Sequence, residues 1–206
     1  MYHSKYGAMQ ESTLVFIESG LRHFIKNNPI SGFEGIRIFE MGLGTGLNAL
    51  LSWNEALALK QKILYHAIEL YPLTEDEIQN LNYEKFILNK NVQLPAIHHA
   101  PWSKLVEPDA YFSFCKTKED IREFTTPGKF HIIYFDAFDP NTQPELWTEA
   151  IFKKMYAMLY PSGILVTYCS KGSVRRAMKA AGFAIEKLKG PPGKREITRA
   201  TKPTLH

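Results

Sequence analysis

The sequence contains few cysteines and no long apolar run, and these two absences exclude several protein classes. Of its 206 residues only Cys115 and Cys169 are cysteines, and neither belongs to a Cys-x-x-Cys pair. No disulfide framework is possible with this pattern, so we expect reduced, buried thiols and a cytoplasmic protein. No window approaches the roughly 18 apolar residues of a membrane helix, and no apolar run of signal-peptide length opens the chain. We therefore expect no membrane partner.

Metal-binding clusters, internal repeats and low-complexity tracts are also missing. His98-His99 is an isolated pair without cysteine or carboxylate ligands at useful spacing, so no metal site is predicted. Hydrophobic residues make up 45% of the chain and charged residues 22%, the balance of an ordinary folded domain. The length fits one domain. We predict that residues 1–30 form an N-terminal extension with a helix, packed on a main domain of residues 31–202.

The charge is mildly basic and unevenly distributed. The formal net charge is +4, with an isoelectric point of about 8.9. Between Lys171 and Lys202 ten basic residues face only Glu186 and Glu196, which gives this stretch a charge of +8. Two interpretations remain open for it, an ordinary solvated surface or a patch that binds phosphates.

Strands and helices are predicted to alternate along most of the chain. After an irregular start over Tyr2–Gln10, apolar periodicity predicts helices at 11–25, 47–60, from 75 onward, 117–124, 145–159 and 173–181. Strands are predicted at 36–41, 63–69, 111–115, 130–136 and 164–169, with a turn at 161–163. Two last strands, 184–189 and 196–200, flank Pro191-Pro192-Gly193. This order predicts an α/β fold: a mostly parallel, doubly wound, Rossmann-like sheet with a C-terminal antiparallel hairpin.

A glycine-rich loop follows the first predicted strand and opens a helix. It reads Glu40-Met41-Gly42-Leu43-Gly44-Thr45-Gly46-Leu47-Asn48. Glycine lets a backbone turn tightly and approach a ligand, although a turn can also need glycine for its own sake. The spacing differs from the dinucleotide pattern G-x-G-x-x-G, and Gly-x-Gly-x-Gly after an acid is usual in enzymes that use S-adenosylmethionine (SAM). Because SAM carries an amino group and a sulfonium, a nearby carboxylate is chemically sensible.

Two more acids follow predicted strands. Glu69 ends the second strand, where a carboxylate can accept both hydroxyls of a ribose; the plain alternative is a surface acid. Asp136 ends the apolar strand that begins at Phe130, and there it can hold an amine nucleophile and take up its proton. The plain alternative is a turn-forming acid, which is our interpretation of Asp139-Pro140. The carboxyl ends of parallel strands meet at one edge of the sheet, so we expect these acids to converge.

Motifs along nearly the whole chain resemble one methyltransferase family. They comprise Ser4, Gly7, Glu11-Ser12 with Val15-Phe16, Gly42–Asn48, Glu69 with Pro72-Leu73-Thr74, Phe135–Phe138 with Pro140, Pro144–Thr148, Thr167-Tyr168 with Ser170, Val174-Arg175-Arg176, Ala181-Gly182-Phe183 and Gly193–Glu196. Each is short, but in this order they are specific. The chain resembles the MnmD type, which completes the modified wobble uridine of bacterial tRNA and is also the N-terminal half of the bifunctional protein MnmC.

The resemblance implies a class I SAM-dependent fold and methyl transfer from SAM to the amine of 5-aminomethyl-(2-thio)uridine in the tRNA anticodon stem-loop. It implies that SAM is held by Glu40, Gly42, Gly44, Thr45, Gly46, Asn48, Glu69 and Asp136, with Asp136 also the catalytic residue. It places Phe138, Trp147, Ser170, Arg175, Arg176, Lys194 and Arg195 near the tRNA. No FAD-dependent oxidase half lies within this sequence, so the resemblance leaves the source of the aminomethyl substrate and the oligomeric state open.

Two positions depart from the family pattern. Where the family has Gly-Asp after its third strand, this chain has Cys115-Lys116, which puts the adenine contact in doubt; Asp120 is a candidate substitute. Where the family often has Gly-Phe, this chain has Gly172-Ser173.

Aromatic residues suggest how an amine could react. Desolvation by Phe138, Trp147 and Tyr168 would favour the neutral, nucleophilic amine, with Asp136 as positioner and proton acceptor. Trp53, Trp102 and Trp147 are either core residues or platforms on which a loop base stacks.

Two other functions remain open at this stage. An aminopropyltransferase shares the expected fold and an amine acceptor, but Gly44-Thr45-Gly46 departs from its usual Gly-Gly-Asp-Gly loop. A non-catalytic SAM- or RNA-binding module is the other, and the acids at 69 and 136 argue against it.

Overall fold

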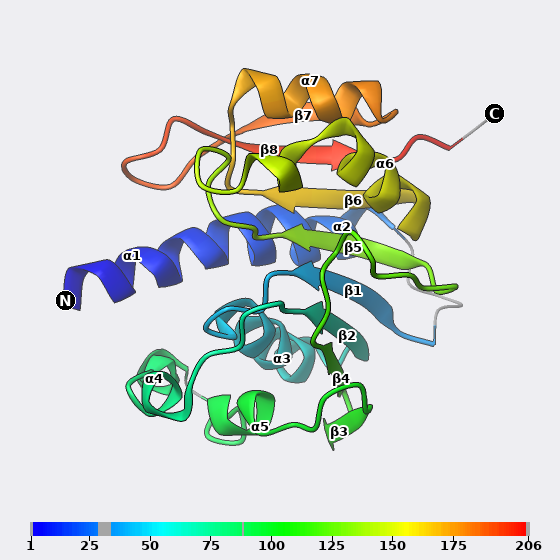
Figure 1. The fold of residues 1–206 in the computed structure, drawn as a ribbon. Coiled ribbons are helices and arrows are strands. Elements are labelled where there is room, and N and C mark those ends of the chain that lie inside the picture. The colour runs from blue at the N-terminus through cyan, green and yellow to red at the C-terminus, as the bar shows by residue number, and fades with distance from the viewer. Residues whose placement is uncertain (1, 29–33, 88, 205–206) are drawn as a thin grey trace.

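Five parallel strands form the centre of the sheet in the computed structural model, which describes residues 2–28, 34–87 and 89–204. They are β1 (Ile36–Met41), β2 (Ile63–Ile68), β4 (Phe112–Thr117), β5 (Phe130–Phe135) and β6 (Leu159–Thr167). β3 (Val106–Asp109) pairs antiparallel with β4, and the hairpin of β7 (Ala184–Lys189) and β8 (Glu196–Thr201) joins antiparallel to β6. The described sheet has eight strands in the order β3-β4-β2-β1-β5-β6-β8-β7 (Figure 1).

The central strands are apolar on both faces because helices cover both. In β5, Ile132 and Tyr134 pack into one core cluster, whereas Ile133 and Phe135 pack into the other. Alternate residues of a strand point to opposite faces, so the continuous apolar run over 130–135 is the pattern of a strand buried between two layers. All six residues of β5 are buried.

The first core cluster lies beneath the N-terminal helix and α3 (Leu47–Leu59). The N-terminal helix is continuous through α1 (Tyr2–Ser12), a π-helical segment η1 (Thr13–Arg22) and α2 (His23–Asn27), and it runs along the sheet (Figure 1). Arg22 fastens it to α3, with Nε 2.7 Å from a Glu55 carboxylate oxygen.

The second core cluster lies beneath α6 (Glu149–Met158) and α7 (Gly172–Ala180). Phe152 and Met155 of α6 and Met178 of α7 have no exposed surface. The short helices α4 (Glu75–Gln79), η2 (Tyr83–Phe86) and α5 (Leu94–His98) lie between β2 and β3 along the chain. A further 3₁₀ turn, η3 (Pro144–Trp147), precedes α6.

The fold class predicted from the sequence is confirmed, including the hairpin at the sheet's C-terminal edge. The helix predicted from residue 75 is present as α4, and Thr74 and Glu77 form a capping box at its start. The helices predicted over 11–25 and 173–181 are also present; they end at Asn27 and Ala180, and Gly182 after the second has φ +103°.

Four local predictions are wrong. Tyr2–Gln10 is helical instead of irregular, and Ala8 and Met9 pack against the core. Residues 118–124 form turns, because the Asp120 carboxylate accepts from the backbone N–H of Arg122 and competes with a helix. Val106–Asp109 is an edge strand despite Pro108, a position where proline is tolerated. Residues 161–163 lie inside β6, where the pairing with β5 shifts register.

The predicted helix over 145–159 is interrupted. Thr148 is extended, at φ −91° and ψ 160°, and its side chain caps α6 by accepting from the Ile151 N–H. η3 therefore ends before the cap and α6 begins after it.

Candidate active site

A cavity of about 470 Å³ lies at the carboxyl ends of the parallel strands. β1 lies between β2 on one side and β5 on the other, so the order of the parallel strands reverses at β1. Open α/β sheets bind ligands at such a switch point, and the volume lies in the usual range for small-molecule sites. Residues from the N-terminal helix, the glycine loop, the end of β2 and the loop after β5 line the cavity.

The glycine loop approaches its neighbours more closely than a side chain would permit. Gly42 has φ +90°, and a Cβ there would lie 2.8 Å from the backbone oxygen of Asp136. Gly44 has φ +48°, and a Cβ there would meet nothing within 4 Å, so this position borders open cavity. Gly42 is therefore needed for packing of the loop on β5, and Gly44 leaves the backbone open to a ligand.

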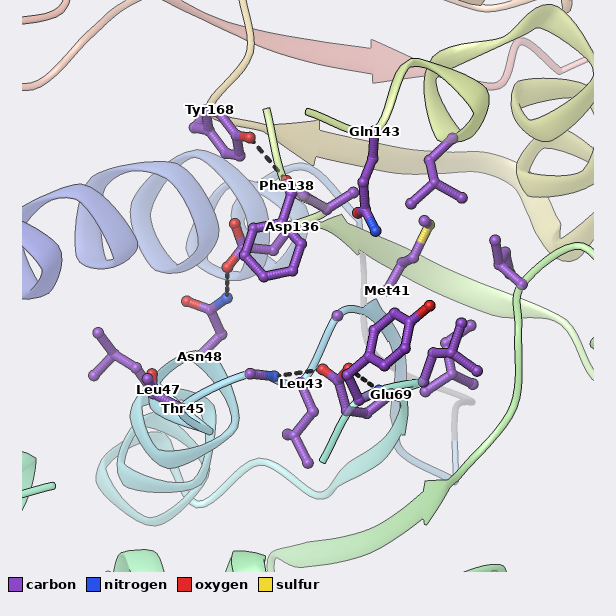
Figure 2. A pocket seen from close by; sticks show the side chains of 18 of the residues that line it. Met41, Leu43, Thr45, Leu47, Asn48, Glu69, Asp136, Phe138, Gln143 and Tyr168 are labelled. Carbon is purple, nitrogen blue, oxygen red and sulfur yellow. Dashed lines mark hydrogen bonds between the residues drawn. The ribbon is translucent and has the colours of Figure 1, made fainter. Parts of the chain in front are cut away.

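Glu69 ties the glycine loop to the end of β2. One carboxylate oxygen accepts from the Gly44 N–H at 2.9 Å and the other accepts from the Tyr71 N–H at 2.8 Å (Figure 2). Each carboxylate oxygen has two lone-pair directions, so Glu69 retains capacity to accept further hydrogen bonds from a ligand.

A buried chain of hydrogen bonds connects β1 to Asp136. The Asn48 amide nitrogen donates to Glu40 at 2.9 Å. It also donates to Asp136 at 2.8 Å (Figure 2). Glu40 has no exposed surface and does not line the cavity, which corrects the prediction that it contacts SAM directly. Burial, together with the Asp136 charge, raises the pKa of Glu40 well above its usual range, although the Asn48 hydrogen bond opposes this. Glu40 thus acts on the cavity through Asn48.

Asp136 lines the cavity and has a perturbed acidity. Burial and, to a smaller extent, the Glu11 carboxylate raise the pKa of Asp136, while the Asn48 hydrogen bond and the Lys194 ammonium lower it. The net pKa is about 6. A carboxyl with a pKa near neutrality is suited to accept and release a proton at physiological pH.

Aromatic residues surround the mouth of the cavity beyond Asp136. Phe138 lines it with 66% of its surface exposed, and Tyr168 lines it with its hydroxyl donating to the Ala137 carbonyl at 2.8 Å (Figure 2). Trp147 is only 5% exposed, and its indole N–H donates to the Phe138 carbonyl at 2.8 Å. Trp147 therefore supports the loop from the core, which corrects the prediction that it contacts the substrate. Trp53 is likewise a core residue, stacked on Phe112.

Cys115 and Lys116, which stand where the family has Gly-Asp, lie outside the cavity. Lys116 is buried, its ammonium bonds the His98 carbonyl, and it lies 4.4 Å from the centroid of the Trp102 ring. Asp120 does line the cavity, where its carboxylate accepts from Arg122 Nε at 3.0 Å. Asp120 is thus exposed to the cavity, and its contact with adenine stays a prediction.

The residues near α7 and the β7–β8 hairpin that were predicted to contact tRNA differ in their exposure. Arg176 and Arg195 are exposed, and Ser170 is partly exposed just before α7. Arg175 is buried and bonds Glu196 at 2.7 Å and Thr198 at 3.1 Å, so it stabilises the hairpin and is not available to tRNA, contrary to prediction. Lys194 bonds Glu11 across the cavity's edge.

The two remaining positions of the glycine loop, Thr45 and Gly46, differ in whether they line the cavity. Thr45 lines the cavity, and its carbonyl lies 3.0 Å from His98 Nε2. Gly46 does not line it; it is buried at φ +73°, and a Cβ there would lie 3.1 Å from His98 Nε2. Gly46 therefore serves the turn into α3 and not the ligand contact predicted for it.

Glu11, Tyr71 and Gln143 also line the cavity and were given no role from the sequence. Glu11 belongs to a motif of the family resemblance, but no local pattern links an N-terminal helix to a sheet edge 125 residues later. Among the residues that the structure describes, no helix is long and apolar enough to span a membrane, and no group of three potential metal ligands occurs.

Comparison with protein families matches residues 102–203 to a family described as S-adenosyl-L-methionine-dependent methyltransferase. Among curated proteins, the bifunctional protein MnmC of tRNA 5-methylaminomethyl-2-thiouridine biosynthesis from Pseudomonas savastanoi pv. phaseolicola is 27% identical over 98% of this chain and 32% of its own length. The homologous protein of Leptospira interrogans is 28% identical over 96% of this chain and 32% of its own length. The chain thus spans about a third of these relatives.

Solved structures share the fold. MNMC2 from Aquifex aeolicus has a TM-score of 0.68 at 22% identity, covering 97% of this chain and 63% of that one. SAM-bound CalS10, an amino pentose methyltransferase from Micromonospora echinaspora, has a TM-score of 0.58 at 14% identity, covering 98% and 96%.

The cavity also fits SAM, on which the matched family is described as dependent. Three of the acids that line it, Glu69, Asp120 and Asp136, suit a ligand with a cationic amino group and a sulfonium. Asn48 lines it too, and its buried carbonyl oxygen has no hydrogen-bond partner among the described residues. A buried acceptor of this kind is costly unless a ligand or water donates to it. The fold, the family match over residues 102–203 and this set of acceptors agree: the chain is a SAM-dependent methyltransferase with the class I fold, and SAM is its cofactor.

Proposed function

We propose that this methyltransferase acts on tRNA and methylates the amine of 5-aminomethyl-(2-thio)uridine at the wobble position. The names of the curated relatives support the substrate, since both describe synthesis of 5-methylaminomethyl-2-thiouridine in tRNA. The observation that carries the proposal is Asp136, a carboxyl with a pKa raised to about 6, in one cavity with the glycine loop and an exposed aromatic ring at position 138.

The glycine loop and two acids would hold the cofactor. The open backbone at Gly44 and Thr45 admits it, Glu69 accepts from the ribose hydroxyls, and Asp120 lies at the edge where the adenine end would reach. When bound, SAM supplies an electrophilic methyl group on a sulfonium sulfur.

Asp136 would receive the acceptor amine. An ammonium has no lone pair, so the amine must lose a proton before or as its nitrogen bonds to the methyl carbon and the sulfur–carbon bond breaks. Asp136 takes that proton and returns it to solvent, and Asn48 holds the carboxylate toward the cavity. The partly buried site favours the neutral amine, and alignment of the nitrogen with the methyl group supplies much of the rate.

The surface around the mouth would bind the RNA. Loop bases are unpaired and stack on aromatic side chains, and Phe138 presents such a face. Exposed cations, including Arg176 and Arg195, would contact phosphates of the anticodon stem. A tRNA substrate would also place the enzyme in the cytoplasm.

Nucleoside mass spectrometry of tRNA from cells with and without this protein tests the proposal. Loss of the protein should remove the methylated nucleoside and accumulate the aminomethyl nucleoside, one methyl group lighter. Unchanged tRNA nucleosides would contradict the proposal. Offering decarboxylated SAM and putrescine to the purified enzyme tests the aminopropyl alternative, for which we expect no product because the family match describes methyl transfer.

A further inference from the structure

An ion pair crosses the edge of the cavity next to Asp136. The Lys194 ammonium, in the turn between β7 and β8, lies 2.8 Å from the carboxylate of Glu11 on α1. The same ammonium lies 4.4 Å from the centroid of the Tyr168 ring. Two segments separated by 183 positions in the sequence thus meet over one aromatic ring.

The groups around the Lys194 ammonium form a binding site for a cation. A carboxylate and the face of an aromatic ring are two of the groups that attract an alkylammonium. Glu11 and Tyr168 both line the cavity, whereas Lys194 does not. Asp136 is near enough for both charges to act on it, since Glu11 raises its pKa and Lys194 lowers it.

We propose that Glu11 and Tyr168 form the subsite for the ammonium of the incoming acceptor, and that Lys194 holds this place until the acceptor displaces it. The inference rests on the proposed function, because it requires a substrate that arrives as a primary ammonium. The acceptor nitrogen would pass from Glu11 to Asp136, lose its proton to Asp136 and then react.

The Lys194 side chain can move away from Glu11 readily. It has 38% of its side chain exposed, it belongs to a turn with Gly193 at φ +89°, and a lysine chain is flexible. Its removal from Glu11 would leave one carboxylate for one new ammonium, so the exchange conserves charge. A plain structural brace between α1 and the hairpin is the competing explanation, and it predicts different mutant behaviour.

Binding of two matched RNAs tests the inference. The probes are anticodon stem-loops with 5-aminomethyluridine or with uridine at the wobble position, bound to enzyme loaded with S-adenosylhomocysteine, which carries no methyl group to transfer. The ratio of the two affinities cancels phosphate contacts. We expect wild type to prefer the aminomethyl RNA, Glu11→Gln to lose about ten-fold of that preference, and Lys194→Met to retain or increase it.

Glu18→Gln is the matched control, because Glu18 pairs with Arg22 on the same N-terminal helix and does not line the cavity. It should leave the preference unchanged, and melting temperatures should show that all variants fold. A brace predicts that Lys194→Met loses as much preference as Glu11→Gln, and that result would overturn the inference. Full preference in Glu11→Gln would overturn it too.

Charged and titratable groups from other elements also face this subsite. The charged and titratable groups that face Glu11 and Asp136 are Lys194 from the hairpin, Tyr168 after β6, and Glu40 of β1 through Asn48. Wild type that methylates the RNA but shows no preference would refute this subsite alone. Wild type that neither prefers nor methylates the aminomethyl RNA would refute the proposed function.

Discussion

At the scale of single residues, Asp136 combines two requirements that oppose each other. A proton acceptor must be ionised, yet the partly buried position that suits amine chemistry disfavours its charge. Asn48 resolves part of this conflict by donating to Asp136, while burial raises the pKa of Glu40, to which Asn48 also donates. Asn48 therefore lowers the pKa of the proton acceptor against the effect of burial.

The raised pKa of Asp136 predicts a dependence of stability on pH. Its pKa is about 6 in the folded protein against 3.8 for the unperturbed group, so between these values the unfolded chain binds fewer protons. Stability contributed by this site is present below pH 4 and is lost as the pH rises through 6. Asp136→Asn should therefore raise the free energy of unfolding at pH 8, by up to about 3 kcal/mol, and much less at pH 4. Denaturant melts at both pH values measure this, and an equal gain at both would contradict it.

The same pKa predicts an acid limb in catalysis. Because the carboxylate is the active form, kcat/KM should rise through pH 6 and level off above it. Asn48→Leu removes the hydrogen bond that lowers this pKa, so its acid limb should lie at higher pH. A pH profile of methyl transfer checks this, and an unmoved limb would show that Asn48 does not set the acidity.

At the scale of secondary-structure elements, the glycine loop has separate duties at neighbouring positions. Both Gly42 and Gly44 line the cavity, but only Gly42 also permits a close approach to the Asp136 backbone after β5. The strand-loop-helix arrangement followed from the sequence because its apolar periodicity and glycine spacing are local signals. The sequence did not show which glycine faces the ligand, because this depends on the neighbouring strands, which the sheet topology sets.

Alanine substitutions separate these duties. Gly42→Ala should lower the melting temperature strongly, since its Cβ would collide with the Asp136 backbone. Gly44→Ala should cost only about 1–2 kcal/mol for the left-handed backbone but weaken SAM binding about ten-fold. Gly193→Ala is the control, with a φ of +89° and open space around it outside the cavity. Equal SAM affinity in Gly44→Ala and Gly193→Ala, measured by calorimetry, would remove Gly44 from the binding site.

At the scale of the whole molecule, the sequence does not reveal which charged residues are buried and stabilise the fold and which are exposed for recognition. Arg175 and Arg176 are adjacent, yet the first is buried against the hairpin and the second is exposed. Trp147 and Phe138 divide similarly, with the indole in the core and the phenyl ring at the mouth. Composition and motif order predicted the fold and the converging acids; exposure and long-range pairs such as Glu11 with Lys194 required the structure.

The exposed cations predict a salt-dependent affinity for tRNA. Arg176→Ala and Arg195→Ala should each weaken binding and reduce the slope of log affinity against log salt by about one. Lys62→Ala is the control, because Lys62 immediately precedes β2, at the amino ends of the parallel strands, and does not line the cavity. Filter binding at several salt concentrations gives the slopes. An affinity that salt does not change would argue for a small-molecule acceptor in place of tRNA.

Methyl transfer by purified wild type and Asp136→Asn tests the central claim most directly. Each is mixed with SAM labelled in its methyl group and with tRNA from cells that lack this methyltransferase, and the labelled nucleoside is then fragmented. We predict label on the aminomethyl nitrogen with wild type and at least about 100-fold less with Asp136→Asn, while SAM affinity stays within several-fold. Label on the base ring or ribose, or an equal loss of SAM binding in Asp136→Asn, would contradict the account.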